Sequence, residues 1–393
     1  MDFQSPLSLQ TGSGPQLREI RVADGAATVD AKISGIISSS FGLVKTGPGT
    51  LELSAANTYR GATQIDGGTL LLTGTIVVQS SGEGSAFYVN NGSTLKIGAN
   101  GVAGGHPFFV SAGSVDFTGA FSYTAVGLTM GGGAAGTTSS VTTGATGTMA
   151  IGNDGVFYNG HFNNDNGATI SGNLALTSAT DATVRNRTFT VGNSVNATND
   201  LSISAVISNG GTCQSNGLTK LGPGTLNLSG TSTYTGLTTV SAGTLAYGVS
   251  DALSSGAVTV AGGTLDLSSF SDTVGAVTLS SGSIVSSTGV LTGTSYALTN
   301  TGSVSAILAG TAALTKTGAA QRRSLVPTPT SVRPRSMPAR CASPAAQRLM
   351  TARRSNLQMP AARCSMSRTA VRRWVRSRAV ARSASISRSA VAR

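Results

Sequence analysis

Short segments of this chain alternate apolar and polar residues with a period of two, which is the pattern of a half-buried β-strand. In TLEL at 50–53, the alternation places Leu51 and Leu53 on one face of the strand and Glu52 on the other. TLNL at 225–228 and TLDL at 264–267 have the same form. We therefore expect an inward set, Leu51, Leu53, Leu70, Leu226, Leu228, Leu245 and Leu267, and an outward set, Glu52, Asn227 and Asp266.

The Thr-Leu start of this strand motif recurs at nearly constant intervals. Its threonines are Thr50, Thr69, Thr94, Thr225, Thr244 and Thr264. Within the two groups, the steps are 19, 25, 19 and 20 residues. A meander of minimal hairpins would need shorter steps, whereas one turn of a β-solenoid has this length. The interval predicts stacked coils that align like residues in ladders.

A longer repeat spans two of these strands in each group. LVKTGPGTLELSAANTYRGATQIDGGTL at 43–70 aligns without gaps with LTKLGPGTLNLSGTSTYTGLTTVSAGTL at 218–245, and 16 of 28 positions are identical. The Gly-Pro-Gly sequence of each copy predicts a corner before the Thr-Leu strand, because proline presets φ and glycine tolerates positive φ. Thr-Tyr-x-Gly predicts a second corner further along.

Composition supports an all-β chain and divides it into two parts. The 52 glycines and the low aromatic content of 5% favour tight turns and a long, thin core over one wide interior. Residues 1–318 carry 10 Lys/Arg and 15 Asp/Glu, whereas residues 319–393 carry 17 Arg and no acid. The net charge of +12 therefore comes from the tail, and no nucleic-acid partner is expected for the body.

The longer repeat resembles the passenger-associated transport repeat, also called the autotransporter-associated β-strand repeat, of bacterial autotransporter passenger domains. In the first copy the resemblance rests on Lys45, Gly47, Gly49, Thr50, Leu51, Leu53, Ser54, Asn57, Thr58, Tyr59, Gly61, Thr63, Gly68, Thr69 and Leu70. In the second copy it rests on Lys220, Gly222, Gly224, Thr225, Leu226, Leu228, Ser229, Gly230, Thr233, Tyr234, Gly236, Thr238, Gly243, Thr244 and Leu245. The copies depart from the family pattern at Ala55, where glycine is usual, and at Ser232, where asparagine is usual.

The resemblance implies a right-handed parallel β-helix (β-solenoid) at 1–318, exported through an outer-membrane β-barrel translocator that belongs to the intact protein. It implies a location at the cell surface or outer membrane, or secretion, with repeats that assist export and folding. The role implied is structural or adhesive, toward a host or extracellular polysaccharide or another copy of the chain. The start of the chain lacks a basic region followed by an apolar stretch, so we predict no signal peptide in this chain.

Leu314-Thr315-Lys316-Thr317-Gly318 is the start of a third repeat, yet the printed sequence does not continue it. The continuation is present in another reading frame. When the third base of each codon is read with the first two of the next, synonymous codons from Arg323 to Ala342 can give LSGANTYLGATTVDAGTLR. We therefore predict that a frameshift between Gly318 and Ser324 turned repeat codons into a disordered Arg-rich tail at 319–393.

Two alternative functions would depend on other residues of the chain. The Arg-rich tail, with Trp374 available for stacking, could bind nucleic acid or another polyanion. A polysaccharide hydrolase or lyase on a β-helix would need two nearby carboxylates, and Asp24 with Asp30, or Asp154 with Asp165, are the candidate pairs. We favour a protein that is not an enzyme.

We expect no cofactor, no metal and no catalytic residue. His106 and His161 have no Cys or His partner at metal-ligand spacing and are expected in turns or on the surface. The Asn/Asp-rich segment at 152–167 offers oxygen ligands for Ca²⁺ but lacks the spacing of a calcium loop, and such residues also suit solenoid turns.

Overall fold

Every regular element among the described residues is a β-strand. The structure, a computed structural model, describes residues 1–9, 17–75, 86–98, 105–117, 122–160, 165–177, 186–210, 215–299, 301–311 and 313–318. The chain divides into two units, Met1–Val332 and Arg333–Arg393, and all described residues lie in the first. The tail predicted to be disordered, 319–393, lies outside the described residues.

The strands pair in parallel and form ladders in which each coil of the chain supplies one rung. The first ladder contains β3 (Leu17–Arg21), β6 (Gly42–Thr46), β8 (Thr63–Ile65), β10 (Phe87–Asn90), β12 (Phe108–Ser111), β14 (Ser122–Met130), β16 (Thr148–Tyr158), β19 (Asn186–Val191), β22 (Gly217–Leu221), β24 (Thr238–Val240), β26 (Val258–Asp266), β27 (Asp272–Val285), β28 (Val290–Leu298) and β31 (Leu314–Lys316).

A second ladder contains β1 (Asp2–Phe3), β4 (Ala31–Ile33), β7 (Thr50–Leu53), β9 (Thr69–Leu72), β11 (Thr94–Ile97), β13 (Ser114–Asp116), β15 (Ser139–Thr142), β17 (Ala168–Ser171), β20 (Leu201–Ile203), β23 (Thr225–Leu228), β25 (Thr244–Tyr247), the second halves of β26 and β27, and β29 (Ser303–Val304). The third face holds β2 (Leu7–Ser8) with β5 (Ile37–Ser38), then β18 (Asn173–Leu176) with β21 (Val206–Asn209), and β30 (Ile307–Ala309) against β28.

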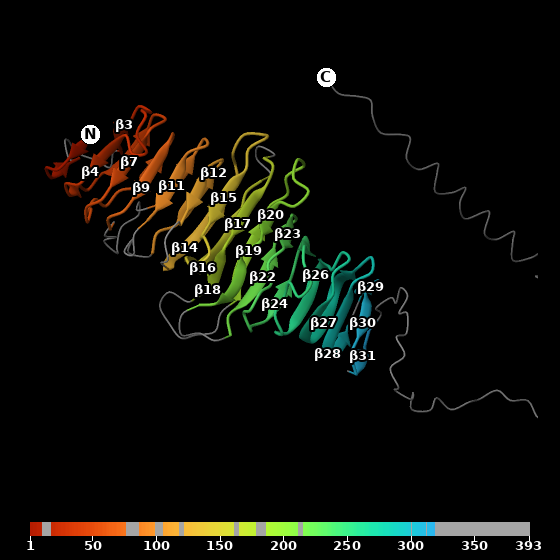
Figure 1. The fold of residues 1–393 in the computed structure, drawn as a ribbon. Coiled ribbons are helices and arrows are strands. Elements are labelled where there is room, and N and C mark those ends of the chain that lie inside the picture. The colour runs from red at the N-terminus through yellow and green to blue at the C-terminus, as the bar shows by residue number, and fades with distance from the viewer. Residues whose placement is uncertain are drawn as a thin grey trace, which may run out of the picture. The chain divides into compact units, whose positions relative to one another are not determined.

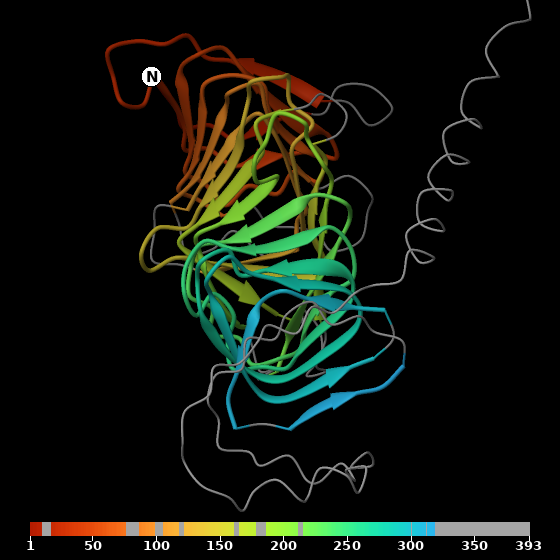
Figure 2. The same cartoon turned by 90° about the vertical axis from the view of Figure 1, so that its right-hand side faces the viewer.

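The coils stack in sequence order from β3 to β31 (Figure 1). In the view turned by 90°, they wind around a common interior (Figure 2). Consecutive rungs of a ladder are separated by one coil of the chain, and parallel pairing satisfies the backbone groups along the stack. The predicted all-β solenoid is confirmed.

Leucines fill the interior as the period-two pattern predicts. All seven inward leucines are exposed by 1% or less, and they belong to one continuous apolar cluster along the stack. The outward residues Glu52, Asn227 and Asp266 are partly exposed. Because every coil buries its own apolar side chains against those of the neighbouring coils, the core is long and narrow.

The predicted ladders of like residues are present. Thr50 lies opposite Thr69, and Thr69 lies opposite Thr94. In the second group, Thr244 lies between Thr225 and Thr264. The steps of 19 to 25 residues are therefore single turns of the solenoid, and the longer step contains the segment 76–85, which lies outside the described residues.

Candidate functional site

The corner of the first repeat buries a lysine. Lys45 lies in β6, its side chain is 0% exposed, and its Nζ atom donates three hydrogen bonds to backbone carbonyl groups. The acceptors are the carbonyl oxygens of Thr46 at 3.1 Å, Gly47 at 2.9 Å and Gly67 at 2.9 Å. An ammonium group has three donors, so each has an acceptor despite burial. Since Gly67 belongs to the next coil, the lysine joins two coils.

The second repeat contains the same arrangement, which we call a lysine cage. Lys220 in β22 is also 0% exposed, and its Nζ atom donates to the carbonyl oxygens of Leu221 at 2.8 Å, Gly222 at 2.9 Å and Ala242 at 3.1 Å. Burial lowers the pKa of Lys220 to about 8, and the negative charge of Asp200 opposes this shift. Burial also lowers the pKa of Lys45.

An aspartate from the preceding coil holds each Thr-Leu strand from the other side. Asp30 Oδ2 accepts a hydrogen bond from the Thr50 N–H at 2.7 Å, and its Oδ1 accepts one from the Gly25 N–H at 2.8 Å. Asp200 Oδ2 accepts from the Thr225 N–H at 2.7 Å. The cage lysine donates to a carbonyl group of the following coil, and the aspartate that binds the Thr-Leu strand belongs to the preceding coil. Each repeat therefore links three consecutive coils.

The glycines of the Gly-Pro-Gly corner meet two different demands. Gly47 and Gly222 have φ of 76° and 77°, in the left-handed region that favours glycine. Gly49 and Gly224 do not have positive φ. Glycine is needed at these two positions because the backbone of the preceding coil lies too close for a Cβ atom. A Cβ atom on Gly224 would lie 2.1 Å from the Gly192 carbonyl oxygen. The corner was predicted, but positive φ is needed at only the first glycine.

The second corner buries a tyrosine whose hydroxyl group pairs with a threonine four residues later. The hydroxyl oxygens are 2.7 Å apart in Tyr59–Thr63 and 2.6 Å apart in Tyr234–Thr238. Burial raises the pKa of Tyr59 to about 12, and it raises the pKa of Tyr234 as well. These groups stay protonated at neutral pH and act as structural hydrogen-bonding partners.

The two copies differ at the position where asparagine is usual. Asn57 is buried, its Oδ1 accepts from the Ile37 N–H at 2.9 Å, and its Nδ2 donates to the Ala55 carbonyl at 3.0 Å. Ser232 is buried at the corresponding position, and its hydroxyl oxygen has no hydrogen-bond partner among the described residues. The substitution therefore removes a side-chain link between coils.

The remaining motif residues occupy the same coils without gathering at a reactive centre. The N–H groups of Thr58 and Thr233 donate to the carbonyl oxygens of Ile37 at 2.9 Å and Ile207 at 2.7 Å, on the third face. Gly61, Gly68, Gly236 and Gly243 lie in turns between the strands of these coils.

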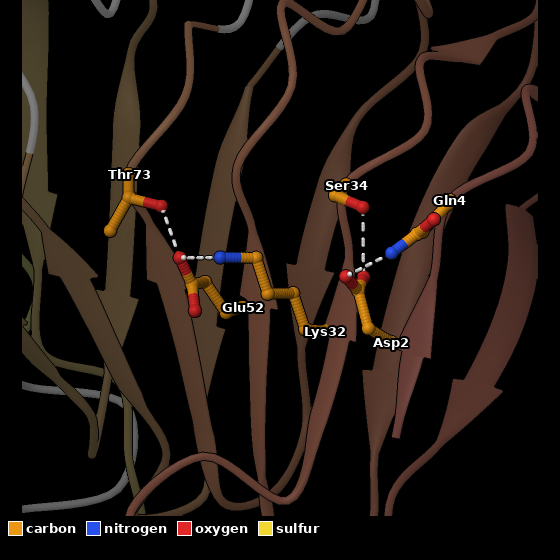
Figure 3. A network of polar contacts seen from close by, with 6 residues as sticks. All are labelled: Asp2, Gln4, Lys32, Ser34, Glu52 and Thr73. Carbon is orange, nitrogen blue, oxygen red and sulfur yellow. Dashed lines mark hydrogen bonds and ion pairs between the residues drawn. The ribbon is translucent and has the colours of Figure 1, made fainter.

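Polar side chains also link coils on the outside of the first repeat (Figure 3). Lys32 Nζ donates to Glu52 Oε1 at 3.1 Å, and Thr73 Oγ1 donates to the same oxygen at 2.6 Å. Ser34 Oγ donates to Asp2 Oδ1 at 2.8 Å and lowers the pKa of that exposed carboxyl group. Exposed ion pairs contribute little stability, so these contacts supplement the buried cage.

Hydroxyl side chains line the outward face of the second ladder in continuous rows. One row is Thr50, Thr69, Thr94, Ser114, Ser140, Thr169 and Ser202, and another is Thr225, Thr244, Thr264, Ser283 and Ser303. Neighbouring hydroxyl oxygens lie 2.9 Å apart in Thr94–Ser114 and in Thr264–Ser283. Parallel rungs set the spacing of such a row at about 4.7 to 4.9 Å.

The acids considered for calcium or hydrolysis have separate environments. Asp165 is buried, accepts from the Tyr158 hydroxyl group, and accepts from the N–H groups of Gly132 at 3.0 Å and Gly167 at 3.2 Å. Asp154 is exposed. Asp24 is exposed as well, whereas both Asp30 oxygens are used in the coil contacts described above.

A hollow of about 420 Å³ lies beside β1, β3 and β4. Apolar side chains such as Phe3, Leu7 and Ile20 line it, and Asp30 is the only carboxylate among the described residues that line it. The described lining therefore does not offer the two carboxylates that hydrolysis needs.

His106 is buried, which corrects the expectation of a turn or surface histidine. Its side chain is 4% exposed, and its ring meets Phe87 edge-on at 5.2 Å between centroids. His161 lies outside the described residues. In the part of the chain that the structure describes, no three His, Cys, Asp or Glu side chains cluster as metal ligands, and no helix could span a membrane.

Sequence reasoning missed Asp200 and the structural role of Asp30, which complete the coil contacts. Each begins a short pattern, Asp-x-x-Ile, in the coil before a repeat, and this shared pattern is the signal that could have identified them. Their distances to the cage lysines differ, 15 residues in one copy and 20 in the other, so a search at fixed spacing does not find them.

The stacked coils and their two cages define a parallel β-solenoid built around coil-linking repeats. A family model described as Passenger-associated-transport-repeat matches residues 43–72 and 218–246, in agreement with the predicted copies. No curated protein and no solved structure matches the chain. The chain thus carries two passenger-associated transport repeats, the repeat type of autotransporter passengers.

Proposed function

We propose that this chain is the solenoid part of an autotransporter passenger, located at the cell surface or secreted, with a structural or adhesive role. In the intact protein, its partner during export is an outer-membrane translocator domain. The transport repeats stabilise the growing stack of coils during export and folding. The observation that carries this proposal is the pair of lysine cages, which link neighbouring coils through the same set of contacts in both repeats.

The cage suits a chain that emerges in extended form and folds coil by coil. Lys220 gains its third acceptor, the Ala242 carbonyl, only when the following coil has docked. Until then, a partly desolvated ammonium group lacks a partner, and this penalty favours docking of the next coil. Repeats placed at intervals along a solenoid can therefore stabilise the edge of the stack as it forms.

The hydroxyl rows support the adhesive part of the proposal. They present hydrogen-bonding groups at regular intervals along one face, which suits a long polymer such as an extracellular polysaccharide. A polysaccharide hydrolase or lyase is the weaker alternative, because the acids considered for it are exposed singly or used in structural contacts. Polyanion binding by the Arg-rich tail depends on residues outside the described part of the chain.

The surface location can be tested on unpermeabilised cells that make the intact protein. An antibody raised against the purified solenoid should label these cells, and a trypsin-resistant fragment containing both repeats should persist when protease is added outside. Labelling only after permeabilisation would contradict the proposal.

The role of the cage can be tested in the same cells with Lys220→Met and with Lys96→Met as its control. Lys96 lies in β11 on the outward face and is partly exposed. We expect Lys220→Met to reduce the amount of protease-resistant fragment at the surface, while Lys96→Met leaves it unchanged. Equal amounts for both variants would show that the cage does not assist export or folding.

A further inference from the structure

The last described rung contains a lysine with two of the three cage acceptors among the described residues. Lys316 in β31 donates to the carbonyl oxygens of Thr317 at 3.4 Å and Gly318 at 2.6 Å, which are the residues one and two positions later, as in both complete cages. In those cages the third acceptor lies 22 residues after the lysine, in the next coil. Position 338, the corresponding position for Lys316, lies outside the described residues.

The strands of this rung have open edges on which another coil can pair. Within the described residues, β29, β30 and β31 each pair on one side, with β27 or β28. Leu314 is partly buried, whereas Leu43 and Leu218, at the same repeat position, are 0% exposed. Open edge strands and a half-covered leucine favour a further rung.

The printed residues after Gly318 do not fit that rung. Positions 319–342 lack the Leu-x-Leu alternation and contain prolines at 327, 329, 334 and 338. Proline has no N–H to donate to a ladder, so it is confined to edges and bulges of sheets.

The frame that starts at the third base of each codon does fit. From Arg323 onward it can read LSGANTYLGATTVDAGTLR, which supplies the Asn-Thr-Tyr and Gly-Thr-Leu elements of the repeat in their usual order. In most of these shifted codons the last two bases are fixed by the printed amino acids, so only the first base is free. Met337 has a single codon, and it contributes AT to the shifted aspartate and G to the shifted alanine.

The same frame also supplies a glycine and a threonine between Gly318 and this match, and the codon after them reads Thr, Ala, Lys or Glu where both complete repeats have leucine. The third base of Ala319 with the first two of Ala320 can give GGC, a glycine codon, and the third base of Ala320 with the first two of Gln321 can give ACA, a threonine codon. This glycine and threonine would follow Lys316 by four and five residues, the spacing at which a glycine and a threonine follow each complete cage lysine.

A single missing base near the codon of Ala319 accounts for the spacing of the whole repeat. With one base restored, the shifted leucine follows Leu314 by ten residues, the interval from Leu218 to Leu228. The alanine of the shifted Asp-Ala-Gly-Thr-Leu then follows Lys316 by 22 residues. Ala242, which accepts from Lys220, lies at this distance and also precedes Gly-Thr-Leu.

We propose that the coil that docks on β31 is encoded by the codons of residues 319–342 read in this displaced frame, and that its alanine carbonyl completes the Lys316 cage. The solenoid then continues into a third transport repeat. This inference extends the proposed passenger function, on whose repeat assignment it rests.

The nucleotide sequence from the codon of Leu314 to that of Ala342 is the direct test. We expect it to contain GGC-ACA after the break and to spell NTYLGATTVDAGTL in the displaced frame. Codons that spell another sequence there would overturn the proposal and would leave the surface-labelling test of the passenger function unaffected. Conversely, unlabelled cells with the expected codons would overturn only the passenger function.

A second test compares two full-length proteins, one as printed and one with a single base restored at the codon of Ala319. In the restored protein, we expect Lys316→Met to lower the thermal unfolding midpoint by a few degrees, similar to the shift caused by Lys220→Met. In the printed protein, Lys316→Met should leave the midpoint unchanged while Lys220→Met still lowers it. Equal effects of Lys316→Met in both proteins would overturn the proposed cage.

Discussion

Asp272 is a buried acid at the start of β27, one coil beyond the second repeat. Its side chain is 2% exposed, and its Oδ2 accepts from the Leu253 N–H at 3.0 Å. Burial raises the pKa of Asp272 to about 6, while the hydrogen bond from the Leu253 N–H acts in the opposite direction. The other titratable groups that influence this cluster are Asp251, which raises the pKa of Asp272, and Tyr234, which raises that of Tyr247.

This raised pKa makes stability depend on pH. Between the ordinary aspartate pKa and about 6, the folded chain keeps the proton that the unfolded chain loses, so stability falls as pH rises through this window. Asp272→Asn stays neutral and should be more stable than the wild type by up to about 3 kcal/mol at pH 7.5, with the difference largely lost at pH 4. Thermal unfolding at both pH values measures this. Asp24→Asn, at an exposed acid outside this cluster, serves as the control, and a difference for Asp272→Asn that is constant with pH would contradict the raised pKa.

At the scale of single elements, the corner before each Thr-Leu strand depends on backbone geometry that few residues can adopt. Gly222 combines φ of 77° with close approach, because an added Cβ atom would lie 2.4 Å from the Val191 carbonyl oxygen. Gly92, in the turn between β10 and β11, has φ of 76° but no atom within 4 Å of an added Cβ. Alanine variants at these two glycines therefore distinguish the cost of backbone strain from the cost of steric overlap.

We expect Gly92→Ala to cost about 1 to 2 kcal/mol from left-handed backbone strain alone. Gly222→Ala adds overpacking against the preceding coil and should cost about 2 to 5 kcal/mol in total. Denaturant unfolding of both variants measures the difference. Equal costs would show that the preceding coil moves away freely and that the corner is not tightly packed.

The sequence predicts the strands of the repeats well and the contacts between coils poorly. Leu51 and Leu53 face inward as their period of two requires, since alternation is a local property of the chain. The burial of Lys45 was not predicted, because a lysine beside glycines usually indicates a solvated turn, and only the stacking of coils supplies the carbonyl oxygens that make burial acceptable. Asp30 was predicted only as one member of a possible catalytic pair, and its contact with Thr50 depends on the register between two coils.

At the scale of the whole described solenoid, each coil contacts mainly the coils before and after it. Stability in such a stack is close to a sum of coil terms and nearest-neighbour terms, so a defect should have a local effect. The cages and the aspartates strengthen the nearest-neighbour terms at two places along the stack, β6 to β9 and β22 to β25. The coils between them are joined by ladder hydrogen bonds, by apolar packing of side chains such as Phe108 and Val115, and by side-chain contacts such as that of Asp165 with the Gly132 N–H.

Leu226→Ala tests this local coupling, with Asn227→Ala as the adjacent control on the opposite face of β23. Leu226 is 0% exposed, so its truncation should cost about 2 to 5 kcal/mol, whereas Asn227→Ala should change stability by no more than about 0.5 kcal/mol. In hydrogen exchange of the intact chain, Leu226→Ala should reduce protection in the adjoining rungs β20 and β25, which pair directly with β23, and leave β7 of the first repeat as protected as in the wild type. Loss of protection in β7 as large as in β20 would show that the stack unfolds as one unit, because a defect at one coil would then reach coils with which it shares no contact.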